Sequence, residues 1–257
     1  MNDSHKEIRT ADLLRVLGRS FLIQLSWSYE RMQSLGFAYA IEPVLRKLYP
    51  DASEYEARLR LHMEYFNTQP YLASFILGAV VRLEEDRAAG RNADPDIKGL
   101  KESLMAPLGA LGDSFFWGAL RPVSAVMAAA LLLTGSWWAP ILYLVVYNVW
   151  HLGIRSGAFF RGYQTGGDAV DLLANYRFTV RAKLFKVVTL FVLGGVIGSM
   201  PVWRPEFRPE SHAQALSIAG MAFTLLLIAG LQRGSSPIKL MLGLAALCLA
   251  LAYTGVI

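Results

Sequence analysis

The stretch from residue 104 to 123, which reads LMAPLGALGDSFFWGALRPV, constrains the fold of this chain more than any other. It is mostly apolar, yet it contains two prolines, three glycines and two charged residues, Asp113 and Arg121. Helix breakers at this density are foreign to the core helix of a water-soluble protein, and an ordinary membrane span would exclude the carboxylate. Irregular backbone and a charge at membrane depth are tolerated only where protein buries them or a hydrated cavity borders them. The stretch therefore predicts a transport pathway in a membrane protein.

The composition also favours a membrane protein. Hydrophobic residues make up 54% of the 257 positions and charged residues only 18%. Residues 1–121 carry 15 of the 25 Lys and Arg and 16 of the 20 Asp and Glu. The first half is therefore expected to be polar or interfacial with apolar hairpins, and the second half a bundle of spans. The net charge of +5 is attributed to membrane topology, because no Lys/Arg run with interleaved aromatics indicates a nucleic-acid surface.

Several kinds of site are not expected. The single cysteine, Cys248, lies in an apolar stretch, so neither a disulfide framework nor a cysteine-based metal site is predicted. None of the histidines has a carboxylate at a spacing that marks a nucleophile and its base. We therefore expect no catalytic residue, no metal and no cofactor. The N-terminus has no apolar core near its start, so no cleaved signal peptide is expected. The histidines are His5, His62, His151 and His212.

The apolar stretches predict about five membrane crossings. Residues 122–154 contain no charge and suit two crossings if the first begins near Phe115, because a bilayer core needs roughly 20 helical residues. A Gly/Ser/Pro turn with Trp137 and Trp138, suited to the interface, separates them at residues 134–140. The stretches 187–203, 211–232 and 240–257 suit one crossing each.

The positive charges predict the orientation of these spans. The segment 155–186 contains six Lys and Arg against Asp168 and Asp171, so it is expected to be a cytoplasmic loop. Residues 204–210 are balanced and suit the outer face. Arg233 and Lys239 bracket an inner turn, which leaves the C-terminus on the extracytoplasmic side.

The upstream half predicts shorter elements. Residues 10–22 form an amphipathic pattern with Thr10 as the N-cap, compatible with a helix on the membrane surface or with one packed on its own domain. Its apolar stripe is Leu13, Leu14, Leu17 and Phe21. Residues 54–64 predict a charged, solvated helix. Residues 70–81 are apolar but too short to cross a bilayer, which favours a re-entrant or buried segment, and residues 104–121 are expected to form a second one.

Individually, the polar residues near these segments have ordinary structural explanations. Asn67 and Gln69 carry amides that suit sugar hydroxyls, but Asn-Thr before a proline is more often a helix-terminating turn. Asp113 is equally compatible with capping a helix that starts at Phe115. Trp117 suits lipid or core packing, and Arg121 suits snorkelling to the interface.

Together, the motifs resemble one family, the IID subunit of mannose-class sugar phosphotransferase systems. The resemblance covers essentially the whole chain, and its specific parts are FNTQP and GD-x-x-FWG-x-x-RP. The matching blocks, in order, are WSYERMQSLGF (27–37), FNTQP (66–70), ILGAVVRLEEDRAAG (76–90), IKGLKESLMAPLGALGDSFFWGALRPV (97–123) and GYQTGGDAV (162–170).

The resemblance implies a function for the predicted fold. We expect an all-α integral membrane protein with an interfacial helical arm (1–62), a re-entrant hairpin region on the sugar path (63–121) and a transmembrane bundle (122–257). A IID subunit pairs obligately with a IIC subunit, in a higher-order hetero-oligomer of the bacterial cytoplasmic (inner) membrane. The pair moves a hexose-type sugar, while the cytoplasmic IIB and IIA proteins supply the phosphoryl group. The chain itself is then not an enzyme.

The motif positions give the expected site. The resemblance carries the sugar path over to Asn67, Gln69, Asp113, Trp117 and Arg121. Structural or partner-facing roles are expected for Trp27, Glu30, Arg31, Glu84, Glu85, Pro107 and Gly112, with Glu84 and Glu85 facing cytoplasmic partners or capping the hairpin.

The chain departs from the family pattern at three positions. It has Ala106 and Ala110 at usual glycines and Gly109 at a usual alanine. These departures keep open an alternative, a sensory or structural membrane subunit that no longer transports. An ion-coupled transporter and, last, a membrane enzyme are further alternatives.

Overall fold

The computed structural model describes residues 7–92 and 95–169, together with positions 188, 236, 238, 239, 242, 243 and 246. The chain divides into two units, residues 1–197 and 198–257, and the following description concerns the first. Apart from those single positions, the spans predicted at 187–203, 211–232 and 240–257 lie outside the described residues. So do the loop at 204–210, the C-terminus with its predicted orientation, and the side chains of His5, His212 and Cys248. Within the described residues the structure is helical and contains no β-strand, which confirms the all-α class.

The first two helices, α1 (Thr10–Ser20) and α2 (Ser34–Leu48), pack against each other. Leu13, Val16 and Leu17 of α1 are buried, whereas Leu14 is 53% exposed and Phe21 also remains largely exposed. The predicted apolar stripe is therefore split. Leu13 and Leu17 pack on the chain's own domain, whereas Leu14 and Phe21 form an apolar edge that faces outward.

The start of α1 differs from the prediction by one residue. Arg9 rather than Thr10 is the N-cap, and its backbone N–H donates to the carboxylate of Asp12 at 3.0 Å. This contact caps the start of α1, because the acidic side chain in the first turn accepts a backbone N–H that has no partner within the helix.

The third helix, α3 (Ala52–His62), begins at Asp51, whose carboxylate accepts the backbone N–H of Glu54 at 2.9 Å. His62 is its one buried residue. This confirms the charged, solvated helix predicted for this part of the chain.

Two longer helices, α4 (Ala73–Ala88) and α7 (Ala139–Thr165), form the most extensive helix pair. Their backbones touch at two glycines. A Cβ at Gly78 would lie 2.1 Å from the carbonyl oxygen of Phe159, and one at Gly162 would lie 2.0 Å from that of Phe75. The apolar segment predicted at 70–81 is thus buried against α7, since small residues allow this close approach.

The stretch expected to be irregular is a continuous helix instead. Helix α5 (Ile97–Gly112) passes through a π-helical segment (Asp113–Leu120) into α6 (Arg121–Leu133). The N–H of Arg121 donates to the carbonyl of Phe116, five residues back, so the helix widens ahead of Pro122 rather than breaking. The predicted break in this stretch was wrong, and so was a helix start at Phe115 capped by Asp113.

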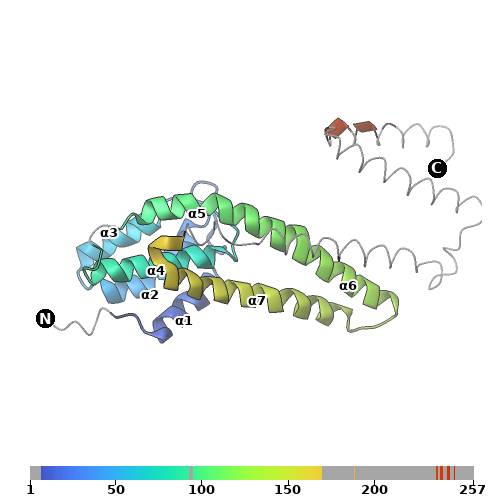
Figure 1. Ribbon diagram of the computed structural model, residues 1–257, viewed down its shortest axis with the longest axis horizontal. Helices are drawn as coiled ribbons and strands as arrows, with labels where there is room; N and C mark the ends of the chain where they lie inside the picture. Colours follow the sequence, from blue (N-terminus) through green and yellow to red (C-terminus); the bar gives the residue numbers. More distant parts are fainter. Residues whose placement is uncertain are drawn as a thin grey trace, which may run out of the picture. The chain divides into compact units, whose positions relative to one another are not determined.

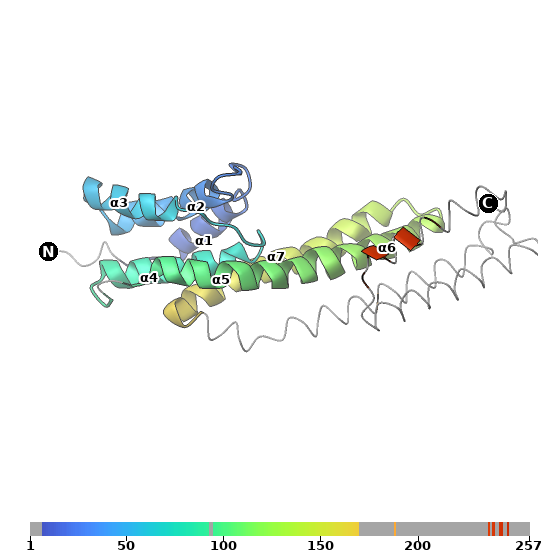
Figure 2. The same cartoon turned by 90° about the horizontal axis from the view of Figure 1, so that it is seen from above.

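Figures 1 and 2 show α5 and α6 as one rod running beside α7. Among the described residues, the helix Ile97–Leu133 is the one long and apolar enough to cross a membrane. A turn containing Gly135, at φ 80°, joins α6 to α7, as predicted for residues 134–140. Because α7 continues to Thr165, the predicted loop 155–186 begins as helix, and its part beyond residue 169 is outside the described residues.

Candidate functional site

A pocket of about 630 Å³ lies between the loop before α4, the face of α5 and the start of the π-helical segment. Residues from the loop between α1 and α2 complete its wall. Four of the five residues expected on a sugar path line it. The lining is Gln24, Trp27, Gln33, Tyr65, Asn67, Thr68, Gln69, Pro70, Glu102, Met105, Ala106, Gly109, Ala110, Asp113 and Trp117.

The loop that carries Asn67 is held in place from two sides. The side-chain amide of Gln33 donates to the carbonyl of Thr68 at 2.8 Å and accepts its N–H at 3.4 Å. The hydroxyl of Thr68 donates to the carbonyl of Met105 on α5 at 2.8 Å. Thr68 is buried, whereas Asn67 is exposed to the pocket. The loop is therefore a fixed platform that presents the Asn67 side chain.

Gln69 has one satisfied and one unsatisfied polar atom. Its Oε1 accepts the backbone N–H groups of Tyr71 at 2.8 Å and Leu72 at 3.0 Å, just before α4. Its Nε2 is buried and has no hydrogen-bond partner among the described residues. The side chain is only 2% exposed and packs directly against Gly112. A buried donor without a partner costs free energy, so this amide is suited to a ligand acceptor.

The π-helical segment brings Asp113 and Trp117 onto the same wall. The carboxylate of Asp113 is exposed to the pocket and forms no hydrogen bond or ion pair with any described residue. Arg121 does not line the pocket. Its guanidinium lies 4.2 Å from the centre of the Trp117 ring and supports that ring from behind.

Three residues with expected structural roles, Trp27, Glu30 and Arg31, lie in the loop between α1 and α2. Trp27 lines the pocket and packs edge-on against Tyr29, with ring centres 4.8 Å apart. Glu30 and Arg31 have exposed side chains. Their loop is tied down through its backbone, since the carbonyl of Arg31 accepts the N–H of Phe66 at 3.4 Å.

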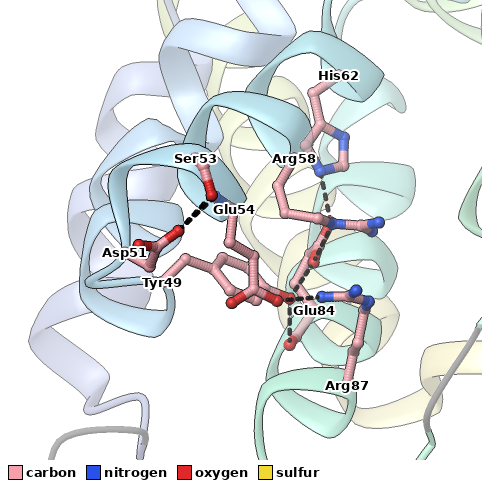
Figure 3. A network of polar contacts seen from close by, with 8 residues as sticks. All are labelled: Tyr49, Asp51, Ser53, Glu54, Arg58, His62, Glu84 and Arg87. Carbon is pink, nitrogen blue, oxygen red and sulfur yellow. Dashed lines mark hydrogen bonds and ion pairs between the residues drawn. The ribbon is translucent and has the colours of Figure 1, made fainter.

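A polar network joins α3 to α4 (Figure 3). Glu84 is completely buried, and its carboxylate accepts hydrogen bonds from His62 at 2.7 Å, Arg58 at 2.7 Å and Tyr49 at 2.6 Å. Arg87, on the same helix as Glu84, donates to Glu54 on α3 at 2.9 Å. The contacts of Glu84 are therefore internal and hold the two helices together.

The network has strongly shifted protonation equilibria. Burial alone would raise the pKa of Glu84, but the hydrogen bond from His62 and the hydrogen bonds and positive charge of Arg58 outweigh it and lower that pKa to about 2. Burial lowers the pKa of His62, and its buried Nδ1 has no partner among the described residues. Both observations favour the neutral imidazole, which donates its Nε2–H to the Glu84 carboxylate.

Glu85 is also buried and also bonds within the chain. It accepts the N–H of Ile8 at 3.0 Å and the hydroxyl of Tyr163 at 2.7 Å, and so ties the N-terminal segment and α7 to α4.

Several residues in or next to the pocket were missed by the sequence analysis, among them Gln33, Thr68, Glu102 and Tyr71. Tyr71 contacts Phe116 and Trp117 of the π-helical segment, with ring centres 4.8 and 5.6 Å away, and its hydroxyl bonds to Tyr147 of α7 at 3.1 Å. Tyr71, Gln33 and Thr68 lie in or next to the motif blocks. Their position in or beside these blocks was the one signal in the sequence that could have identified them, because they are not part of a helical or strand periodicity.

The arrangement is suited to binding rather than to bond breaking. Amides, two carboxylates and two indoles line the pocket, and this mixture can donate to hydroxyls, accept from them and pack on an apolar ring face. Among the described residues there is no group of three or more His, Cys, Asp or Glu that could hold a metal ion.

Comparisons with known proteins agree with one another. The family model described as PTS system mannose/fructose/sorbose family IID component matches residues 7–257. The mannose-specific EIID component of Escherichia coli K12 is 38% identical over 196 residues, which cover 76% of this chain and 69% of that protein. The sorbose-specific EIID component of Klebsiella pneumoniae is 32% identical over 193 residues, which cover 75% of this chain and 70% of that protein.

Two solved structures share the fold over almost the whole chain. One is a chain of the cryo-EM structure of the mannose transporter ManYZ in complex with microcin E492, with a TM-score of 0.60 and 29% identity, covering 97% of this chain and 98% of that one. The other is described as a membrane protein, with a TM-score of 0.70, 30% identity and the same coverage.

Proposed function

Because this chain belongs to the mannose/fructose/sorbose family of phosphotransferase-system IID components, we propose that it forms the uptake path for a hexose-type sugar together with a IIC membrane subunit. It is a membrane permease subunit of such a system, and the bacterial cytoplasmic membrane is its proposed location. Phosphoryl transfer to the sugar is assigned to IIB, which receives its phosphoryl group from IIA.

The observation that carries the proposal is the set of uncommitted polar groups in the pocket. The buried Nε2 of Gln69 and the carboxylate of Asp113 both lack partners among the described residues. The side chain of Asn67 faces the same space. With the Glu102 carboxylate, which also lines the pocket, these side chains supply both donors and acceptors for the hydroxyls of a sugar ring. Trp27 and Trp117 supply apolar surface for the ring's C–H face.

The alanines at usual glycine positions do not weigh against transport. Ala106 and Ala110 lie in the regular part of α5, a conformation that alanine adopts readily, and both are exposed on the pocket wall. They narrow the pocket by two methyl groups without straining the backbone. A change in sugar preference is the expected consequence, rather than loss of transport.

The proposed mechanism is alternating access. The pocket walls come from α5, the π-helical segment and the loop 66–70, which hydrogen bonds link to one another. A body of this kind can carry the sugar by rocking against the remaining helices and the IIC subunit, as in other transporters with a site between moving parts. The hydrogen bonds to sugar are made by side chains, so no coupling ion is required.

Uptake of labelled sugar by membranes that contain the chain with its IIC partner tests the proposal. Asp113→Asn removes the charged acceptor without changing size, and Asp113 does not cap a helix, so uptake should fall by more than tenfold while the complex still assembles. Asp96→Asn is the matched control. Asp96 caps α5 by accepting the N–H of Gly99 at 2.8 Å, and asparagine caps equally well, so uptake should be unchanged.

Gln69→Glu tests the amide directly. The carboxylate keeps an acceptor for the two backbone N–H groups before α4 but lacks the unpaired donor. Uptake should fall, whereas the amount of assembled complex should not. Wild-type uptake in both Asp113→Asn and Gln69→Glu would remove this pocket from the sugar path.

A further inference from the structure

The α1–α2 pair carries a second groove, separate from the proposed sugar pocket. Its volume is about 560 Å³. It contains four cations and two carboxylates, so it carries an excess of two positive charges. The charged lining residues are Asp12, Arg15, Arg19, Glu42, Arg46 and Lys47.

The two carboxylates do not neutralise the groove. Glu42 pairs with both Arg19, at 2.6 Å, and Arg46. Asp12 pairs with Lys47 at 2.6 Å. Arg15 forms no hydrogen bond or ion pair with any described residue, and its side chain is exposed. The groove is therefore held open by ion pairs and retains positive charge for a ligand.

An exposed apolar edge adjoins this charge. Leu14 on α1 and Phe21 at its C-cap lie seven residues apart and so share one exposed stripe, while Arg15 and Arg19 lie on a different face of the helix. Leu25 continues the apolar edge beyond the helix and is 77% exposed.

Helix α2 extends the same division between apolar and charged surface. Leu35 and Tyr39 are exposed near its start, and Arg46 is exposed near its end. The guanidinium of Arg19 lies 4.4 Å above the Tyr39 ring, at the boundary between the two zones. Exposed apolar side chains therefore lie close to the cations along the pair, with Leu14 directly before Arg15 and Tyr39 against Arg19.

We propose that this groove binds the phosphate groups of an anionic membrane phospholipid, whose acyl chains lie along the exposed apolar edge of α1 and α2. A cationic groove supplies the charge complement of a phosphodiester, and the apolar edge supplies the surface that a soluble phosphate would not need. The excess of two positive charges matches the two phosphates of cardiolipin. This inference is independent of the sugar path.

Native mass spectrometry of the purified full-length chain with its membrane partner tests the proposal. The complex is stripped of lipid and titrated with cardiolipin or with phosphatidylcholine, which has no net charge. Cardiolipin should bind at least tenfold more tightly. Inorganic phosphate, added in excess, should not displace it, because the acyl chains contribute to binding.

Arg46 and Arg60 form a matched pair of variants. Each is exposed, at 68% and 76%, and each forms an ion pair with a glutamate four residues earlier, but only Arg46 lines the groove. Arg46→Gln should weaken cardiolipin binding about fivefold, the effect of roughly one cation near an anionic surface. Arg60→Gln should leave it unchanged.

Two further variants keep the test decisive if Arg46→Gln is poorly folded. Glu42→Gln should strengthen cardiolipin binding, because it releases Arg19 and Arg46 from their shared partner. Leu25→Ser should weaken it without changing the charge. Equal affinity of cardiolipin for the wild type, Arg46→Gln and Glu42→Gln would overturn the proposal. Full displacement by inorganic phosphate would overturn it also, since the groove would then be a site for free anions.

Discussion

Gly112 lies against Gln69 so closely that a Cβ at position 112 would stand 2.5 Å from both Cβ and Cγ of the glutamine. The contact joins α5 to the turn before α4. It also holds the glutamine amide with its oxygen on the backbone N–H groups of Tyr71 and Leu72, just before α4, and its nitrogen without a partner among the described residues. The glycine is thus required by space rather than by backbone conformation.

Gly112→Ala should displace Gln69 and lower both stability and sugar uptake. Overpacking of this kind costs about 1–3 kcal/mol, which lowers the apparent melting temperature by several degrees. Gly109→Ala is the control, because a Cβ there would meet only the Thr68 hydroxyl oxygen at 3.8 Å, an ordinary contact. Thermal unfolding of the two variants in detergent compares them, and equal melting temperatures would contradict the prediction.

Gly162→Ala should loosen the packing of α4 on α7. A Cβ at this position would lie 2.0 Å from a backbone oxygen, which cannot move aside as a side chain can. Gly157→Ala on the same helix has open space around it and should be tolerated. The expected result is loss of assembled protein in membranes for the first variant and normal levels for the second. Similar amounts of both would show that the helices do not need this contact.

The His62–Glu84 pair should make the stability of the folded protein depend on pH. The pKa of His62 is lowered by folding, so its contribution is present above its ordinary value of 6.5 and declines as the pH falls below it. The pKa of Glu84 is lowered to about 2, so its contribution is lost between its ordinary 4.5 and about 2. The melting temperature should therefore drop in two stages on acidification. His62→Gln should flatten the first stage and keep the second, and an unchanged first stage in that variant would exclude His62 as its cause.

Arg121→Lys should impair uptake even though it keeps the charge. A guanidinium stacks on Trp117, and an ammonium on a flexible stem does so less well. A loss of about threefold to tenfold is expected from the magnitude of such contacts. Arg91→Lys, outside the pocket lining, serves as the control in the same uptake measurement. A fully active Arg121→Lys would show that only the charge matters.

The sequence was most informative where local pattern and burial agree. The α3 helix, the turn after α6 and the amphipathic α1 follow from capping residues, glycine and apolar periodicity. The short apolar segment at 70–81 was identified as buried or re-entrant, and the structure buries it by packing two glycines against backbone. That pairing joins positions 78 and 159, which no local pattern connects.

The sequence was least informative at the prolines. The prolines and glycines of residues 104–123 led us to expect irregular backbone, but Pro107 and Pro122 both lie within one continuous helix. A π-helical turn widens to pass a proline, and nothing in composition or periodicity distinguishes this from a break. The pocket residues Asn67, Gln69, Asp113 and Trp117 were selected by motif resemblance. Their shared wall depends on the tertiary contacts of Gln33, Thr68 and Gly112.

The unbroken rod from Ile97 to Leu133 has a mechanical consequence. Its 37 residues give a length of about 55 Å, well beyond the roughly 30 Å of a bilayer's hydrocarbon core. The backbone angles at both ends of the π-helical segment, at Gly112 and Arg121, are α-helical, so the helix continues through the segment without a break. A tilt of about 10° would therefore swing one end by about 10 Å relative to the other. The helix that forms the pocket wall thus acts as a lever, and whatever moves its far end in the membrane also moves the wall.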